Sequence, residues 1–246
     1  MPAPPKTLVM TATYNEIENL PLLADEIFLH APEVDLLVID DNSPDGTGQW
    51  ADERAAADGR LRCVHRAGKL GLGTATIAGM KFAIENGYDW VLNLDADFSH
   101  HPKYLPDFFA LAQPTEGPPP DVVIGSRYVR GGGAVGWPLK RHVMSRGVNI
   151  YTRLMLGLKS RDCSGAFRMY RTELLKKLNF DEIVSRGYSF QEEILWRLAR
   201  QGARFVETPI VFDDRVRGQS KVNSSEVRNA VRIIFQLGCR HWLGKP

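Results

Sequence analysis

The chain has few cysteines and lacks long apolar runs. Its three cysteines are odd in number, far apart and without C-x-x-C spacing, so neither a disulfide framework nor a common zinc motif is predicted. The first residues lack the charged and then apolar layout of a signal peptide. No apolar run reaches the roughly 18 to 20 residues that cross a bilayer. We therefore expect a cytoplasmic protein whose contact with a membrane is peripheral, on its cytoplasmic face.

Familiar nucleotide and nucleic-acid signatures are also missing. The sequence has no Walker loop, and no G-x-G-x-x-G fingerprint at the turn after the first expected strand, which argues against ATPases and nicotinamide-dependent dehydrogenases. It has neither a DNA-reading helix motif nor the aromatic pattern of RRM or OB domains, so no nucleic-acid partner is expected.

Short β-rich runs alternate with helical patterns along the first half of the chain. The expected elements are strands at 7–13, 34–39, 61–65 and 90–94, with helices at about 17–30 and 73–86. This alternation predicts an α/β fold with a mostly parallel sheet covered by helices on both faces. Ligands of such sheets bind at the carboxyl ends of the strands.

A proline-rich segment at 113–120 is the expected boundary between two halves of one domain. Beyond it we expect strands at 122–126 and near 205–212, and helices at about 144–157, 188–201 and 224–238. The predicted organisation is one domain over 1–246, with halves at about 7–112 and 121–222 and a C-terminal amphipathic helix at about 223–246. Two roles fit that helix: lying on an anionic membrane surface, or packing on the domain.

Carboxylates follow two of the expected strands. Asp95 and Asp97 come directly after the fourth strand, where they would hold Mg²⁺ or Mn²⁺ together with phosphate oxygens; helix capping is an equally common role for aspartate. Asp40 and Asp41 end the second strand, where acids often receive ribose or base donors. His100 and His101 are adjacent and should point apart, so they are interpreted as surface residues or neighbours of the site.

Basic residues are concentrated in the second half. Ten Lys or Arg and one acid, Asp162, lie between Arg127 and Arg171. A solvated face is one interpretation, and a phosphate-bearing substrate is the favoured one. Lys69, just before Gly71 and Gly73, would suit a diphosphate, although a helix start is the commoner reason for such glycines.

Several motifs occur in a characteristic order. They are TYNE at 13–16, DDNSPDGT at 40–47, KLGLGTA at 69–75, DADFSH at 95–100 and GSRY at 125–128. Together they resemble family 2 glycosyltransferases of GT-A fold. Later motifs, GAFR at 165–168, FQEE at 190–193 and RVRGQSK at 215–221, are similar to the dolichyl-phosphate mannosyltransferase branch. The resemblance covers nearly the whole chain, from about Leu8 to Lys221.

This resemblance implies a metal-dependent site with a donor part and an acceptor part. The donor, GDP-mannose, would be held by Tyr14, Glu16, Ile39, Asp41, Lys69, Asp95, Ala96, Asp97, Arg127, Arg215 and Lys221. The acceptor, a polyprenyl or dolichyl phosphate, would be held by Arg127, Arg141 and Arg146, with Arg130 as a weaker candidate. Mg²⁺ or Mn²⁺ would lie on Asp95 and Asp97, and Asp97, Arg215 and Lys221 would be catalytic. The chain departs from the family at Ala12, usually proline, and at Arg217, where an aromatic residue is common.

The implied reaction is an inverting, single in-line displacement of the nucleotide diphosphate. The acceptor phosphate is already ionised near neutral pH, so no general base is required; Asp162 and Glu193 would be the candidates otherwise, although pairing with basic residues is their more ordinary role. A small membrane subunit is a conceivable partner, because many relatives carry transmembrane helices. Two alternatives stay open: another donor such as UDP-glucose, or another acceptor, on the same fold, and a nonenzymatic subunit that binds nucleotide sugars.

Overall fold

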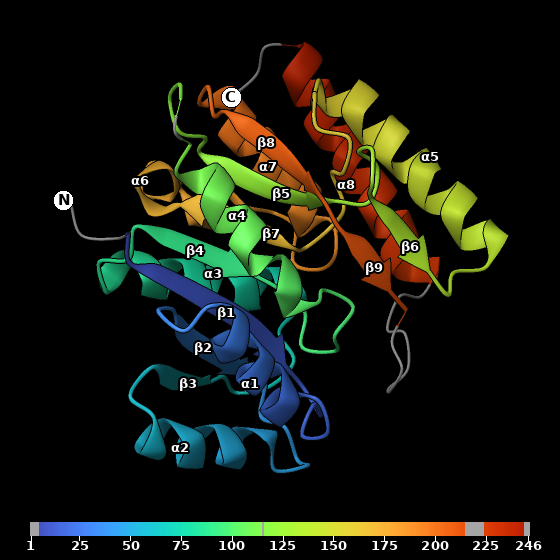
Figure 1. The fold of residues 1–246 in the computed structure, drawn as a ribbon. Helices are drawn as coiled ribbons and strands as arrows, with labels where there is room; N and C mark the ends of the chain where they lie inside the picture. The colour runs from blue at the N-terminus through green and yellow to red at the C-terminus, as the bar shows by residue number, and fades with distance from the viewer. Residues whose placement is uncertain (1–4, 115, 215–223, 244–246) are drawn as a thin grey trace.

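A seven-stranded sheet forms the centre of the molecule. The computed structural model describes residues 5–114, 116–214 and 224–243 (Figure 1). The strand order is β3-β2-β1-β4-β7-β5-β8. The strands are β1 (Thr7–Thr13), β2 (Asp35–Asp40), β3 (Leu61–His65), β4 (Trp90–Asn93), β5 (Val122–Ser126), β7 (Arg168–Arg171) and β8 (Phe205–Pro209). All neighbours pair in parallel except β7, which runs antiparallel to β4 and β5. The predicted mostly parallel sheet is therefore confirmed.

Helices cover both faces of this sheet (Figure 1). They are α1 (Leu20–His30), α2 (Thr47–Ala57), α3 (Leu72–Glu85), α4 (Leu105–Ala112), α5 (Leu139–Leu156), α6 (Thr172–Leu175), α7 (Phe190–Arg200) and α8 (Ser224–Trp242), with short 3₁₀ turns η1 (Pro102–Tyr104) and η2 (Phe180–Glu182). Two further strands, β6 (Gly133–Val135) and β9 (Val211–Asp213), form a separate parallel pair.

Successive side chains of the strands pack alternately into two separate cores. On β1, Leu8 and Met10 pack with α3 and α7, whereas Val9 between them packs with α1 and α4. This follows from the two-residue period of a strand, which sends successive side chains to opposite faces. Because both faces are buried, the strands read as continuous apolar runs, the pattern on which the sequence prediction rested.

Several elements differ from the sequence prediction, among them helix α2, which was not predicted, and three elements of the second half. Helix α5 begins at Leu139 rather than near 144, so the basic residues 140–142 are helical. Strand β7 was not predicted, because arginines at both its ends hide a four-residue strand. The strand expected near 205–212 is divided into β8 and β9, because the chain leaves the main sheet after Pro209 to pair with β6.

The C-terminal helix α8 packs against the domain beside α5 (Figure 1). Ile234 and Leu237 are each 1% exposed, and Gly238 lies so close to Met155 of α5 that a Cβ atom would clash. Phe235 stays 55% exposed on the outer side. Packing on the domain is therefore one role of this helix. Within the described part of the chain, no helix has both the length and the apolarity needed to span a bilayer.

Candidate active site

A polar hollow of about 330 Å³ opens at the carboxyl ends of β1, β2 and β4. We call it the carboxyl-edge hollow. The predicted residues that line it are Tyr14, Glu16, Asp41, Lys69, Asp95, Ala96 and Asp97. Ala12, one of the two departures from the family pattern, lines it too. Ile39 does not: its side chain is 1% exposed and points from β2 into the core, where Gly79 of α3 leaves room for it.

Three loops with left-handed residues build the rim of this hollow. Asn15, Asn42 and Phe98 have φ values of 58°, 58° and 61°, and each lies shortly after a strand, β1, β2 or β4. Asparagine tolerates this conformation, but Phe98 is a strained choice. Such strain is held by surrounding contacts and concentrates at functional sites. One contact here joins the first two loops, because the Asn15 N–H donates to Ser43 Oγ at 3.0 Å.

Asp40, the last residue of β2, and Asp41, which follows it, have different roles. Asp40 is 1% exposed and accepts hydrogen bonds from Thr13 Oγ1 and the Ser43 N–H, both at 3.0 Å. It therefore holds the loops together. Asp41 faces the hollow and pairs with Arg66, Nη1 to Oδ1 at 3.1 Å. Sequence reasoning missed Arg66, which follows β3 without any motif, because only the tertiary fold brings it to Asp41.

Asp95 and Asp97 both face the carboxyl-edge hollow from the loop after β4. Asp97 is 7% exposed, and its Oδ1 accepts from the Ser99 N–H at 3.0 Å and from Ser99 Oγ at 2.5 Å. These bonds fix the side chain of Asp97 in place. The side chain of Asp95 is 29% exposed. Two carboxylates on one loop in a polar hollow fit a hard divalent cation such as Mg²⁺ or Mn²⁺.

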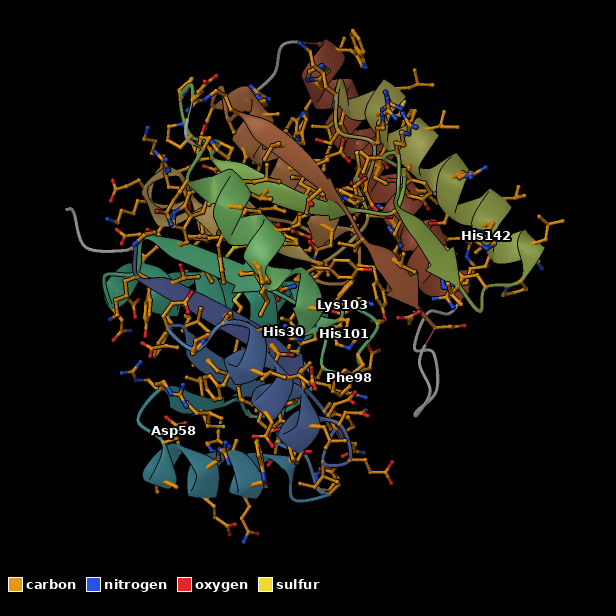
Figure 2. The ribbon with its side chains drawn as sticks, viewed as in Figure 1. His30, Asp58, Phe98, His101, Lys103 and His142 are labelled. Carbon is orange, nitrogen blue, oxygen red and sulfur yellow. The ribbon has the colours of Figure 1, made fainter. Side chains whose placement is uncertain are left out.

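The two adjacent histidines point apart, as expected. His101 lies beside His30 of α1 (Figure 2), with ring centroids 6.2 Å apart. His100, in contrast, is 2% exposed and packs on Phe167; of the two interpretations, it is a neighbour of the site and not a surface residue. Burial lowers the pKa of His100 to about 4, so its ring is neutral at pH 7. Its Nδ1 accepts the Asp95 N–H at 3.3 Å, which steadies the aspartate loop.

A second hollow, mostly apolar and about 230 Å³, adjoins the first. We call it the apolar hollow. Its apolar walls come from Trp137, Met144, Val148, Phe212, Val231 and Ile234, contributed by α5, α8, β9 and the loop after β6. Its cationic groups are Arg127 and Arg141. Asp95, Leu72 and Tyr188 line both hollows, so a carboxylate that fits a metal lies at their junction.

Arg127 is held firmly in the wall of the apolar hollow. Its guanidinium makes a bidentate pair with Asp162, Nε to Oδ2 and Nη2 to Oδ1 both at 2.7 Å, and also donates to Ser164 Oγ at 2.9 Å. Burial alone would raise the pKa of Asp162, but the Arg127 guanidinium holds it below its usual value. A carboxylate engaged in this way is a poor base. The ordinary role, pairing with a basic residue, is therefore observed for Asp162.

Arg141 reaches the same hollow from the first turn of α5. It pairs with Asp214, Nη1 to Oδ1 at 2.8 Å, and its guanidinium lies 4.3 Å from the ring centroid of Trp137. Arg146, predicted with it, does not line the apolar hollow. Arg141 and Ser145 are four residues apart on one face of α5, whereas Arg146 is rotated to another face and lines a separate hollow. Arg130 is exposed.

The acids of α7 were only partly anticipated. Glu193 is fully buried and accepts from Arg197 Nε at 2.8 Å and from the Ser185 N–H at 2.9 Å, so it is a structural residue. Glu192, which we did not predict, lines the apolar hollow. Burial raises the pKa of Glu192 to about 7. The sequence did hold a signal for this difference. Glu193 and Arg197 are spaced as an i, i+4 ion pair, whereas Glu192 has no basic residue at that spacing.

Three residues of interest lie outside the described part of the chain. Arg215 and Lys221, predicted to be catalytic and to hold the donor, and Arg217, the second departure from the family pattern, fall within residues 215–223. Their predicted roles stay predictions.

Comparison with known sequences identifies close relatives. The family model described as glycosyl transferase family 2 matches residues 8–179. The undecaprenyl-phosphate mannosyltransferase of Micrococcus luteus is 43% identical over 240 residues, which cover 97% of each chain. The polyprenol monophosphomannose synthase of Mycolicibacterium smegmatis is 41% identical, over 96% of this chain and 88% of the relative.

Solved structures share the architecture at low identity. Glucosyl-3-phosphoglycerate synthase from Mycobacterium tuberculosis, in complex with phosphoglyceric acid, superposes with a TM-score of 0.66 at 20% identity, over 98% of this chain and 81% of that one. The same enzyme with Mn²⁺ and UDP-glucose gives a TM-score of 0.66 at 21% identity, over 98% and 80%. This likeness confirms the expected fold.

Proposed function

We propose that this chain, which belongs to glycosyltransferase family 2, transfers mannose from GDP-mannose to a polyprenyl phosphate. One observation carries the proposal: a polar hollow with paired carboxylates adjoins an apolar hollow with two arginines, and Asp95 lies at their junction. A nucleotide sugar suits the first hollow, and a phosphate on an apolar chain suits the second. The names of the relatives from M. luteus and M. smegmatis support this assignment of substrates.

The carboxyl-edge hollow would hold the donor. Tyr14, Glu16 and Asp41 come from the loops after β1 and β2, where nucleoside groups bind in sheets of this kind. Lys69, whose Nζ lies 3.7 Å from the ring centroid of Tyr14, brings a positive charge toward the diphosphate. Asp95 and Asp97 would hold Mg²⁺ or Mn²⁺, which when bound would neutralise negative charge on the departing diphosphate.

The apolar hollow would hold the acceptor phosphate and the first part of its lipid. Arg127 and Arg141 supply the cations, and their guanidinium planes suit phosphate oxygens. The pairing of Arg127 with Asp162 fixes its orientation before substrate binds. Apolar side chains of α5 and α8, such as Val148 and Ile234, would contact the isoprenoid units.

The chemistry that follows needs little from the protein beyond placement and charge. An oxygen of the acceptor phosphate attacks the anomeric carbon, and the bond from that carbon to the GDP oxygen breaks on the opposite side, so the configuration inverts. The nucleophile is already an anion, since the second pKa of a phosphate monoester is about 6. No residue has to remove a proton, which agrees with the structural roles of Asp162 and Glu193.

The outer face of α5 supports peripheral binding to a membrane. Leu139, Val143, Ile150 and Leu154 share this face and are 79%, 64%, 57% and 69% exposed. The helix contains basic residues and no Asp or Glu. Basic helices with an apolar face lie at the surface of anionic membranes. A membrane at this face would bring the acceptor to the apolar hollow, and a small membrane subunit, if one exists, would meet the same face.

A transfer assay tests the proposal. The enzyme is incubated with Mg²⁺ or Mn²⁺, a short polyprenyl phosphate and radiolabelled GDP-mannose or UDP-glucose, and label is counted in the lipid phase. We expect label from GDP-mannose alone, and its loss in Asp97→Ala with the fold retained. Label from UDP-glucose instead would overturn the donor, and donor binding without any lipid label would overturn the acceptor. Absence of binding to either nucleotide sugar would overturn the mannose donor and UDP-glucose with it.

A further inference from the structure

A third hollow, of about 550 Å³, lies next to the apolar hollow. Arg127 lines both. The rest of the wall includes Arg146 and Arg153 of α5 and Arg161 from the loop that follows this helix. We call it the arginine hollow. Arg146 was predicted to hold the acceptor phosphate but does not reach the apolar hollow, and the proposed function uses none of these three arginines.

No acid in the described part of the chain lines the arginine hollow, although Glu207, outside its lining, accepts the backbone N–H of Arg161 at 2.8 Å. Arg127 and Arg141 each have an acid within 3 Å. Arg146, Arg153 and Arg161, in contrast, are exposed and make no ion pair with an acid of the described residues. Cations gathered at one hollow repel each other. An anion bound among them would relieve this repulsion, and three guanidinium groups suit the oxygens of a phosphate.

The position of the hollow indicates where such an anion comes from. Arg146 and Arg153 are seven residues apart and so lie on one side of α5, two turns from each other. Ile150 lies in the wall between them and is 57% exposed, and Leu154 beside them is 69% exposed. An anion in this hollow is therefore next to an exposed apolar stripe. That combination suits an amphiphile, with a charged head and apolar chains, better than a soluble anion.

We propose that the arginine hollow binds the phosphodiester headgroup of an anionic phospholipid. Arg146, Arg153 and Arg161 hold the phosphate, while Ile150 and Leu154 contact the acyl chains. The proposal rests on the proposed function in one respect, that the acceptor is presented by a membrane. Because Arg127 lines both hollows, the bound phospholipid orients the protein with its acceptor hollow open to the same leaflet.

Vesicle sedimentation without donor or acceptor tests this site independently of transfer. The full chain is mixed with vesicles of phosphatidylcholine, with or without phosphatidylglycerol. We expect binding to the anionic vesicles, and its loss in the variant Arg146→Gln/Arg153→Gln/Arg161→Gln by roughly fivefold per arginine, on the order of 100-fold in all. The matched control, Lys81→Gln/Lys176→Gln/Lys177→Gln, removes equal charge around α3 and α6, away from α5 (Figure 1), and should keep binding within about threefold. Circular dichroism confirms that both variants are folded.

A charge-conserving variant separates a built site from diffuse attraction. In Arg146→Lys/Arg153→Lys/Arg161→Lys the charge remains but the planar donors are lost, so we expect binding weakened by on the order of tenfold. Wild-type affinity in this variant, or no preference for anionic vesicles in the wild type, overturns the proposal. A titration with inorganic phosphate alone is the last arm. Submillimolar binding that depends on the three arginines would assign the hollow to a soluble anion and overturn the lipid. Failure of mannose transfer would leave these results untouched.

Discussion

Glu192 offers a prediction about stability and pH that can be worked from the structure. It is 4% exposed in the wall of the apolar hollow, and its Oε2 has no hydrogen-bond partner among the described residues. Burial raises its pKa from 4.5 to about 7. Between these values the folded protein keeps a proton that the unfolded chain has lost, so the free energy of unfolding falls as pH rises. At roughly 1.4 kcal/mol per pH unit, the free energy of unfolding falls by about 3 kcal/mol over this pH interval.

Substitution by glutamine removes this pH dependence while keeping the shape of the neutral acid. At pH 5 we expect Glu192→Gln to match the wild type within about 1 kcal/mol, and at pH 8 to be more stable by up to about 3 kcal/mol. Urea unfolding at the two pH values measures both differences. The neighbouring variant Glu193→Gln is the control, because Arg197 and the Ser185 N–H would lose their carboxylate. It should be destabilised at pH 8 by about 1–3 kcal/mol.

The decisive quantity is the change between the two pH values. If the difference in unfolding free energy between wild type and Glu192→Gln is the same at pH 5 and at pH 8, Glu192 does not titrate in this interval and the reasoning is refuted. A second assay follows from the place of the residue. Ionised Glu192 adds negative charge to the wall that faces the acceptor phosphate, so acceptor KM should rise above pH 7 in the wild type and stay level in the variant.

Three further predictions concern the site and the core. Asp97→Ala should abolish the part of GDP binding that depends on Mn²⁺, measured by calorimetry with and without the metal; equal loss in both conditions would contradict a role in metal binding. Arg127→Lys loses the bidentate pair with Asp162 and should raise acceptor KM by on the order of tenfold with donor affinity unchanged, whereas a selective loss of donor affinity would move Arg127 to the donor. Gly79→Ala places a Cβ against Met10 and Ile39 and should lower the unfolding free energy by about 1–3 kcal/mol; a thermal melt as stable as that of the wild type would refute the tight packing.

The sequence predicted those parts of the fold that depend on local patterns. The buried runs of β1, β2 and β4 and the turns after them carry the signals of parallel strands, so the carboxyl-edge hollow and Asp95 were placed correctly. Strand β7 was not predicted, because the charged residues at its two ends, Arg168 and Arg171, are more typical of a loop than of a buried strand. Arg168 is in fact 0% exposed and donates to the backbone oxygen of Gln191 at 2.6 Å.

The unpredicted features of the site depend on contacts between distant segments. Arg66 pairs with Asp41 across 25 residues of sequence, and no spacing rule indicates such a pair. Arg146 was grouped with Arg141 because both are cations in one basic stretch, but the phase of α5 sends them to different hollows. This difference could be assigned only once α5 was known to begin at Leu139, because the helix expected from about 144 did not include Arg141.

The reversed strand β7 also affects how the chain is assembled. Ile124 of β5 is paired with Arg168 of β7, so the segment from 127 to 167 leaves the sheet and returns to it at almost the same place. Both β6 and α5 lie in this excursion. The antiparallel pairing of β5 with β7 fixes its ends, while β6 pairs with β9 and α5 packs on α8. Arg127 and Arg141, proposed to hold the acceptor phosphate, lie in this excursion, whereas the residues that line the carboxyl-edge hollow lie outside it. Substitutions within 127–167 are therefore a direct route to changing the acceptor while the proposed donor site is left intact.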